Sequence, residues 1–187
     1  MQAFAALLDG LIYTRSRDHK VRLIADYFRT TPDPDRGWAL AALAGTLSIS
    51  TVKAAAIRAM AEERFDPMLF RMSRDYVGDT AETVALMWPD VSQDVVAPTV
   101  SEVIDVLSGT SRARAPAVLA ELMDRLDANG RYALLKLATG GMRVGISARL
   151  AKTAFGQAFG LSVDDVEEVW HALRPPYAEL FAWGEGK

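Results

Sequence analysis

The feature that most constrains this chain is a helical spacing of apolar residues that recurs along almost its whole length. Near the start, Phe4, Leu7, Leu8 and Leu11 repeat at positions i, i+3, i+4 and i+7, which is typical of one face of an amphipathic helix. No segment alternates apolar and polar residues over the length of a strand. The sequence therefore predicts an all-α protein of about twelve short helices in a single compact domain.

Capping residues and breakers set the predicted helix boundaries. Ser16, Asp79, Ser147 and Ser162 each precede a helical pattern and belong to the residue types that cap helix N-termini. Asp66-Pro67 combines a cap with proline at the first helical position.

Glycines punctuate the same pattern. Asn129-Gly130 is expected to end a helix over 111–126. Two glycine-containing junctions, over 76–81 and 140–145, each join two helical patterns late in their half of the chain. This likeness leaves open an internal duplication with pseudo-two-fold symmetry.

Composition excludes several classes of protein. The 187 residues include no cysteine, which rules out disulfides and thiolate zinc sites, and only two histidines, His19 and His171. No apolar run approaches the roughly 20 residues needed to span a bilayer. The first residues lack the basic segment of a signal peptide, so we expect a cytoplasmic protein without a membrane partner.

Charge is unevenly distributed, although the formal net charge is only −3. Acidic residues concentrate over 164–168, at the start of a predicted helix, where we expect them to interact with the helix dipole rather than to act in catalysis. Basic residues gather near the start and again in the second half: Arg15, Arg17, Lys20, Arg22, Arg29, Arg112, Arg114, Arg131, Lys136, Arg143, Arg149 and Lys152. A folded chain could therefore present one basic face, or these charges could simply solvate helix surfaces.

The glycine-rich segment 140–145 is the most specific candidate site. It places Gly140, Gly141, Arg143 and Gly145 just before the predicted helix that Ser147 caps. Glycine lets the backbone approach a ligand closely, a helix start offers free N–H groups, and arginine offers a fork of donors, which together suit a phosphate oxygen. The alternative is that the glycines only cap the preceding helix. The segment is neither a P-loop nor a dinucleotide fingerprint, and no Gly-x-Ser-x-Gly or His-Glu-x-x-His motif occurs elsewhere.

Four segments, in chain order, resemble those of a known family. They are the basic start over 14–21 with its preceding helix, Gly78-Asp79-Thr80-Ala81-Glu82-Thr83, Thr99-Val100-Ser101-Glu102-Val103, and Gly140-Gly141-Met142-Arg143-Val144-Gly145-Ile146. Together they resemble the N-terminal DNA-binding domain of ATP-dependent DNA ligases, particularly bacterial ones similar to archaeal and eukaryotic replicative ligases. The resemblance covers essentially the whole chain and implies a domain of about twelve helices that holds nicked duplex DNA through the minor groove.

The resemblance also implies which residues contact DNA. The matching positions are Thr14, Arg15, Ser16, Arg17, Lys20, Gly140, Gly141, Met142, Arg143, Val144 and Gly145, with Lys152 added in the following helix. Met142 or Val144 is expected to contact sugars, and Asp79 is expected to be structural because its carboxylate would repel phosphate.

The adenylated lysine of this family lies in a Lys-x-Asp-Gly motif on a nucleotidyltransferase domain, and no lysine of this chain is followed by x-Asp-Gly. We therefore expect a DNA-binding domain over 1–183, with a linker to the catalytic domains beginning over 184–187. The chain alone is expected to be a monomer without catalytic residues, metal or cofactor. The full-length ligase would use ATP and Mg²⁺, and its partners would be nicked double-stranded DNA and its own catalytic domains.

Two other classes of function stay open. An α-helical protein-interaction module would bind a partner through exposed apolar residues, and that binding would survive high salt. A small enzyme would bind a phosphate ligand at 140–145, and that ligand would raise its thermal stability. DNA binding instead predicts steep salt dependence without any effect of nucleotide.

Overall fold

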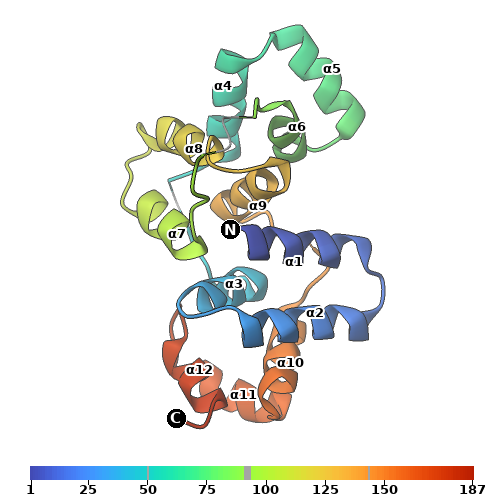
Figure 1. Cartoon of the computed structure of the whole chain (residues 1–187), viewed down its shortest axis with the longest axis vertical. Coiled ribbons are helices and arrows are strands. Elements are labelled where there is room, and N and C mark those ends of the chain that lie inside the picture. Colours follow the sequence, from blue (N-terminus) through green and yellow to red (C-terminus); the bar gives the residue numbers. More distant parts are fainter. Residues whose placement is uncertain (50, 91–93, 143) are drawn as a thin grey trace. The chain divides into compact units, whose positions relative to one another are not determined.

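The computed structural model describes residues 1–49, 51–90, 94–142 and 144–187. Over these residues the chain is all-α, with twelve helices and no strand, as the helical spacing predicts (Figure 1). Contacts divide it into two compact units, a division that the spacing alone does not indicate. Unit 1 comprises Met1–Ala5 and Ile49–Gly141, and unit 2 comprises Ala6–Ser48 and Met142–Lys187. Helix α1 (Gln2–Tyr13) begins in unit 1 and continues in unit 2.

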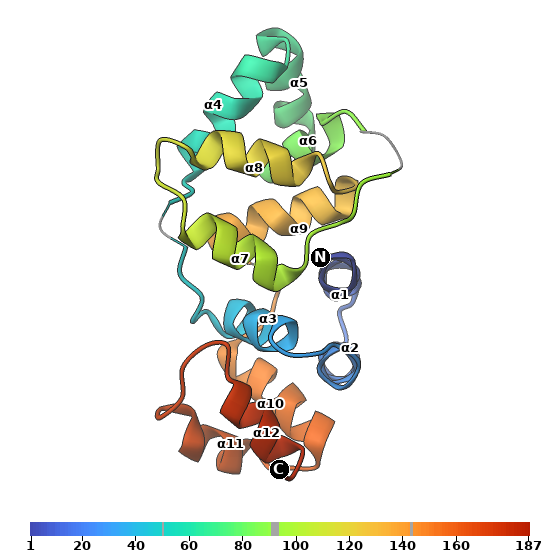
Figure 2. The ribbon, with the colours of Figure 1, turned by 60° about the vertical axis from the view of Figure 1, so that its left-hand side comes forward.

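Unit 1 contains six further helices. They are α4 (Ala54–Arg64), α5 (Pro67–Val77), α6 (Thr80–Met87), α7 (Val100–Ser108), α8 (Ala115–Met123) and α9 (Ala128–Thr139). Helices α7, α8 and α9 pack against one another, as Figure 2 shows, while α6 packs on α9 and α4 on α8. Helix α5 contacts mainly α6 and touches α4 less extensively, so much of its surface has no neighbour within the unit.

A buried arginine organises the polar part of the unit 1 interior. Arg131 is only 2% exposed, and its guanidinium donates to the carbonyl oxygens of Met123 and Trp88 and to the Asp90 carboxylate, at 3.0 to 3.1 Å. A buried cation is tolerated when it is paired and hydrogen-bonded in this way. Arg131 is therefore a structural residue rather than part of a basic surface.

Unit 2 contains the other five helices. They are α2 (Arg17–Thr30), α3 (Asp35–Ala44), α10 (Ala148–Phe159), α11 (Val163–Trp170) and α12 (Ala178–Gly184). Helix α10 is central to the unit, because it packs along α2 and also contacts α3 and α11. The rings of Phe28, Phe155 and Phe181 meet at centroid distances of 5.1 to 6.3 Å, in edge-on or tilted geometry that favours aromatic packing.

The C-terminal residues belong to this fold. Gly184 is the last residue of α12, and Glu185 accepts a hydrogen bond from the buried Arg36 at 2.6 Å. Hydrogen bonds from Arg36 and Lys187 lower the pKa of the Glu185 carboxyl to about 2. Gly184 and Glu185, where the sequence predicts the start of a linker, are therefore held in the folded unit.

Most of the predicted helix starts are confirmed. Ser16, Asp66, Asp79, Ser147 and Ser162 each accept a hydrogen bond from a backbone N–H in the first turn of the helix that follows.

The stop expected at Asn129-Gly130 is wrong. Asp127 caps α9 by accepting from the Gly130 N–H at 2.8 Å, so both residues lie inside that helix's first turn. In the parts of the chain that are described, every helix is too short or too polar to cross a bilayer.

Candidate nucleic-acid interface

Two segments that the sequence singles out separately lie together in unit 2. One is the α1–α2 loop with the first turn of α2, and the other is the loop over 144–147 that leads into α10. Lys20 joins them, because its Nζ donates to the carbonyl oxygens of Val144 and Gly145, each at 3.4 Å. The basic start of the chain and the second part of the glycine-rich segment therefore form one site.

Two helices begin at this site. Ser16 Oγ accepts from the His19 N–H at 3.3 Å at the start of α2, and Ser147 Oγ accepts from the Leu150 N–H at 3.1 Å at the start of α10. The N-terminus of a helix carries partial positive charge and offers N–H groups that have no partner within the helix. The local backbone therefore favours an anion here.

A shallow cleft with a volume of about 310 Å³ opens between these segments. Among the described residues, its lining combines three cationic side chains with the start of α10: Arg15, Arg17, Lys20, Gly145, Ser147 and Leu150. No carboxylate lines it, and the nearby Asp18 pairs with Arg17 only at 3.6 Å while both side chains are well exposed. Such an exposed pair is weak, so the cleft keeps a positive charge that suits phosphate oxygens.

Gly145 has a backbone conformation that favours glycine. Its φ is +67°, in the left-handed region, and a Cβ atom there would lie 2.8 Å from Lys20 Nζ. The absence of a side chain thus lets the ammonium group approach the loop carbonyls. This requirement supports a specific role for the third glycine of the segment.

The first two glycines have a different environment. Gly140 and Gly141 belong to unit 1, where both amide N–H groups donate to the Lys136 carbonyl oxygen at the end of α9. Gly140 has a φ of +71°, so it is a helix C-cap, which is the alternative interpretation of this glycine pair. Their amides are occupied by the cap and are not free donors for a phosphate.

Three residues, Met142, Arg143 and Val144, lie between Gly141 and Gly145. Arg143 lies outside the described residues, and Met142 is half-buried. Val144 is 7% exposed, so its side chain offers little surface to DNA sugars, and of the two residues expected to make that contact Met142 is the more accessible. The Val144 carbonyl oxygen takes part in the site by accepting a hydrogen bond from Lys20.

Lys152 is not among the residues that line the cleft. Its ammonium group lies 4.8 Å from the centre of the Trp170 ring, a cation–π contact that accounts for a half-buried lysine. Arg149, in the first turn of the same helix, pairs with Glu167 at 3.0 Å. The acidic residues of α11 thus offset part of the basic charge of α10.

Asp79 has the structural role that its charge predicts. In unit 1 its carboxylate caps α6 by accepting from the Glu82 N–H at 2.8 Å and pairs with Lys136 Nζ at 2.6 Å. Burial alone would raise the pKa of the Asp79 carboxyl, but the bonds from Lys136 and from backbone N–H groups outweigh it and lower the pKa.

Ser147 and Leu150 line the cleft but were not among the predicted contacts. The capping position of Ser147 was the signal that could have indicated it, since a residue that caps a helix lies at the anion-binding end.

No group of three or more metal-binding side chains occurs within residues 1–49, 51–90, 94–142 and 144–187.

No protein-family model matches this chain, and no curated protein is similar to it in sequence. The resemblance to ligase DNA-binding domains therefore depends on the four motifs alone.

Proposed function

We propose that this chain binds nicked duplex DNA, independently of base sequence, through phosphates and the minor groove. It would position the nick for sealing by the catalytic domains of an ATP-dependent DNA ligase. The observation that carries the proposal is the bridge from Lys20 to the carbonyl oxygens of Val144 and Gly145, which builds one cationic cleft from two segments more than 120 residues apart.

Phosphate contacts give affinity without reading sequence, because base identity is not accessible from the backbone of the duplex. Arg15 and Arg17 are exposed at the cleft, and the start of α10 adds backbone N–H groups. Each phosphate that a cation neutralises contributes about −0.9 to the slope of log K against log salt concentration. Three engaged cations would therefore give a slope of about −3.

The chemistry of sealing would belong to tethered nucleotidyltransferase domains, which would use ATP and Mg²⁺. By holding the duplex, the present chain would raise the effective concentration of the DNA ends near those domains. A monomeric chain in the cytoplasm is part of this proposal.

The test compares two single-charge variants by fluorescence anisotropy on a nicked duplex across a series of salt concentrations. Lys20→Gln removes a cation from the cleft, whereas Lys53→Gln removes an exposed cation at the start of α4 in unit 1. We expect Lys20→Gln to reduce the magnitude of the salt slope by about 0.9, and Lys53→Gln to leave the slope unchanged.

Equal slopes for Lys20→Gln and the wild-type chain would overturn the assignment of this cleft. Binding of DNA that persists at high salt would argue against phosphate recognition altogether. A thermal shift caused by a small phosphate compound at low concentration would favour the enzyme alternative instead.

A further inference from the structure

A second cationic cleft lies in unit 1, between α4 and α5. Its volume is about 630 Å³, compared with about 310 Å³ for the cleft at the start of α10. Among the described residues, its lining comprises three arginines, one glutamate and two apolar residues: Arg58, Glu62, Pro67, Phe70, Arg71 and Arg74. Three positive charges thus face one negative charge, so the cleft keeps a surplus of positive charge.

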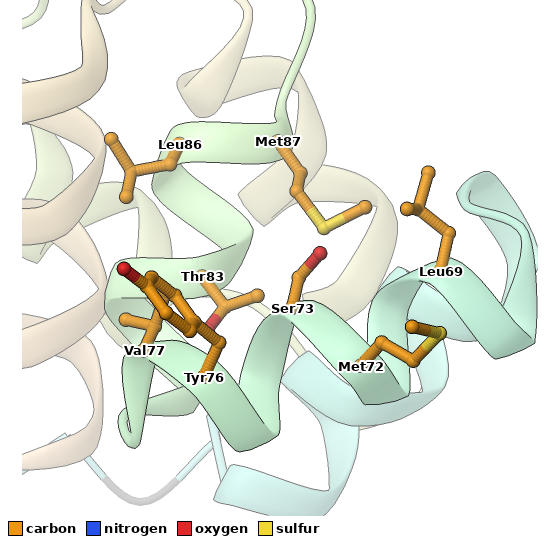
Figure 3. Close-up of a pocket in the computed structure, with 8 residues that line it drawn as sticks. All are labelled: Leu69, Met72, Ser73, Tyr76, Val77, Thr83, Leu86 and Met87. Carbon is orange, nitrogen blue, oxygen red and sulfur yellow. The ribbon is translucent and has the colours of Figure 1, made fainter.

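The helical repeat brings the α5 residues of this cleft to one face of the helix. They follow the spacing i, i+3, i+4 and i+7: Pro67, Phe70, Arg71 and Arg74. The side of α5 toward α6 is apolar instead, and Figure 3 shows Leu69, Met72 and Tyr76 along it. Helix α5 therefore carries Arg71 and Arg74 on the side toward α4, apart from its apolar face.

Aromatic packing fixes the position of α5 beside α4. Phe70 of α5 is 4% exposed, and its ring stacks on that of Phe65, the residue that follows α4, at a centroid distance of 6.0 Å. Phe65 in turn meets the ring of Trp88 edge-on at 6.1 Å. Such packing holds the two backbones from which the arginines extend. The arrangement of the cationic side chains therefore does not depend on a ligand for its framework.

The guanidinium groups of this cleft keep their charge uncompensated. Among the described residues, no ion pair includes Arg58, Arg71 or Arg74. Glu62 lies four residues after Arg58 on α4, which is the less favourable order for a helical ion pair. Arg74 donates through its Nε to Thr80 Oγ1 at 2.8 Å, and this hydroxyl is neutral. The planar forks are thus available for an anion that they can bind in a bidentate manner.

The lining of the cleft favours a nucleic acid over an acidic protein segment. Of the described lining residues, only Pro67 is both apolar and exposed, because Phe70 is buried. Protein interfaces usually contain apolar anchors at their centre, whereas interfaces with DNA are polar and strongly positive. A cleft that offers arginines with so little exposed apolar surface suits the backbone of a nucleic acid.

We propose that the α4–α5 cleft binds backbone phosphates of duplex DNA, as a contact in addition to the cleft at the start of α10. This inference rests on the proposed function, since it assigns a further part of the same interaction. A single exposed charge pair contributes little, but a duplex presents a phosphate about every 3.4 Å along each strand. Arginines on two neighbouring helices can therefore engage phosphates together, independently of base sequence.

The test compares two double variants that remove the same charge from unit 1. Arg58→Gln/Arg71→Gln removes two cations of the cleft, whereas Arg112→Gln/Arg114→Gln removes two exposed cations that precede α8 and do not line it. The affinity of the full chain for a labelled nicked duplex is measured by fluorescence anisotropy across a series of salt concentrations. We expect the cleft variant to reduce the magnitude of the salt slope by about 1.8, and the control to leave it unchanged.

A conservative variant tests the role of the planar fork. Arg71→Lys keeps the positive charge but cannot make a bidentate contact with a phosphate. We expect Arg71→Lys to bind the nicked duplex about threefold more weakly, with the salt slope of the wild-type chain. Because the substituted arginines are exposed, urea denaturation should give all these variants the stability of the wild-type chain.

Two results would overturn the inference and leave the proposed function intact. One is an unchanged salt slope in Arg58→Gln/Arg71→Gln when Lys20→Gln reduces the slope. The other is an equal reduction in Arg112→Gln/Arg114→Gln, which would show an effect of total charge rather than of this cleft. Conversely, a reduced slope in the cleft variant with no change in Lys20→Gln would support this inference and refute the cleft of unit 2.

Other anions are tested on the same variants. The probes are a labelled polyglutamate peptide and inorganic pyrophosphate, measured by anisotropy and by thermal shift respectively. We expect neither to bind at concentrations at which the duplex binds. Binding of either probe that Arg58→Gln/Arg71→Gln abolishes, while the salt slope for DNA is unchanged, would assign the cleft to that anion and overturn the inference.

Discussion

Replacing Gly145 by alanine tests the geometry of the cationic cleft without changing any charge. Gly145 has a φ of +67°, and the left-handed region costs an L-residue about 1–2 kcal/mol, part of which the lower entropy of the unfolded alanine chain offsets. We therefore expect Gly145→Ala to reduce the free energy of unfolding by about 1 kcal/mol. Gly160→Ala is the matched control, since Gly160 has a φ of +71° at the other end of α10.

The two glycines differ in what a methyl group would meet. At Gly160 no atom lies within 4 Å of the added Cβ, whereas at Gly145 the Cβ would lie 2.8 Å from Lys20 Nζ. The flexible end of Lys20 can move away, so the two variants should differ in stability by less than about 0.5 kcal/mol. The moved ammonium group and the added methyl group would, however, obstruct the approach of a phosphate to the loop.

The affinity for DNA should therefore differ between Gly145→Ala and Gly160→Ala, although their free energies of unfolding are nearly the same. We expect Gly145→Ala to bind a nicked duplex about fivefold more weakly, equivalent to ~1 kcal/mol, and Gly160→Ala to bind like the wild-type chain. Because no charge is removed, the salt slope should not change, in contrast to Lys20→Gln. Stability is measured by urea denaturation and affinity by fluorescence anisotropy. Equal affinities for the two alanine variants would refute the reasoning.

Two further predictions concern stability. In Gly37→Ala the new Cβ would overlap the carbonyl oxygen of Pro176, which belongs to the backbone and cannot rotate away, so we expect a loss of at least about 3 kcal/mol in urea denaturation; a smaller loss would show that α3 can shift. The pKa of Asp79 is lowered in the folded chain, so its contribution is present above its unfolded value near 3.8 and is lost as the pH falls through the folded pKa. Asp79→Asn keeps an N-capping residue but loses the pair with Lys136, and denaturation between pH 2 and 6 should show a smaller acid-induced loss than in the wild-type chain; parallel curves would contradict this.

Local signals in the sequence were sufficient to predict most of the helix boundaries. A capping side chain bonds within four residues of its own position, so Ser16, Asp66 and Ser147 could be assigned without knowing the tertiary structure. The sequence Asn129-Gly130 led to a wrong helix end, because Asp127 caps the next helix and accepts a hydrogen bond from the Gly130 N–H. Gly37 shows the limit of local signals, because its need for a bare Cα comes from Pro176, far away in the sequence.

The candidate site was predictable in its residue types but not in its assembly. Basic residues at 15–20 and glycine at 145 could be selected from the sequence, while their contact through Lys20 depends on how α2 packs along α10. The burial of individual side chains could not be predicted either. Val144 is buried although it lies in a loop, whereas Met72 and Tyr76 of α5 are exposed. Helical periodicity identifies an apolar face but not the neighbour that covers it.

The most direct test of the central claim is the affinity of the wild-type chain for a nicked duplex, measured by fluorescence anisotropy from about 50 to 300 mM salt with and without ATP. We expect log K to fall linearly with log salt concentration, with a slope of about −3 or steeper, and ATP to have no effect. Absence of binding at the lowest salt concentration would contradict the account and leave the ligase resemblance as a likeness of fold alone.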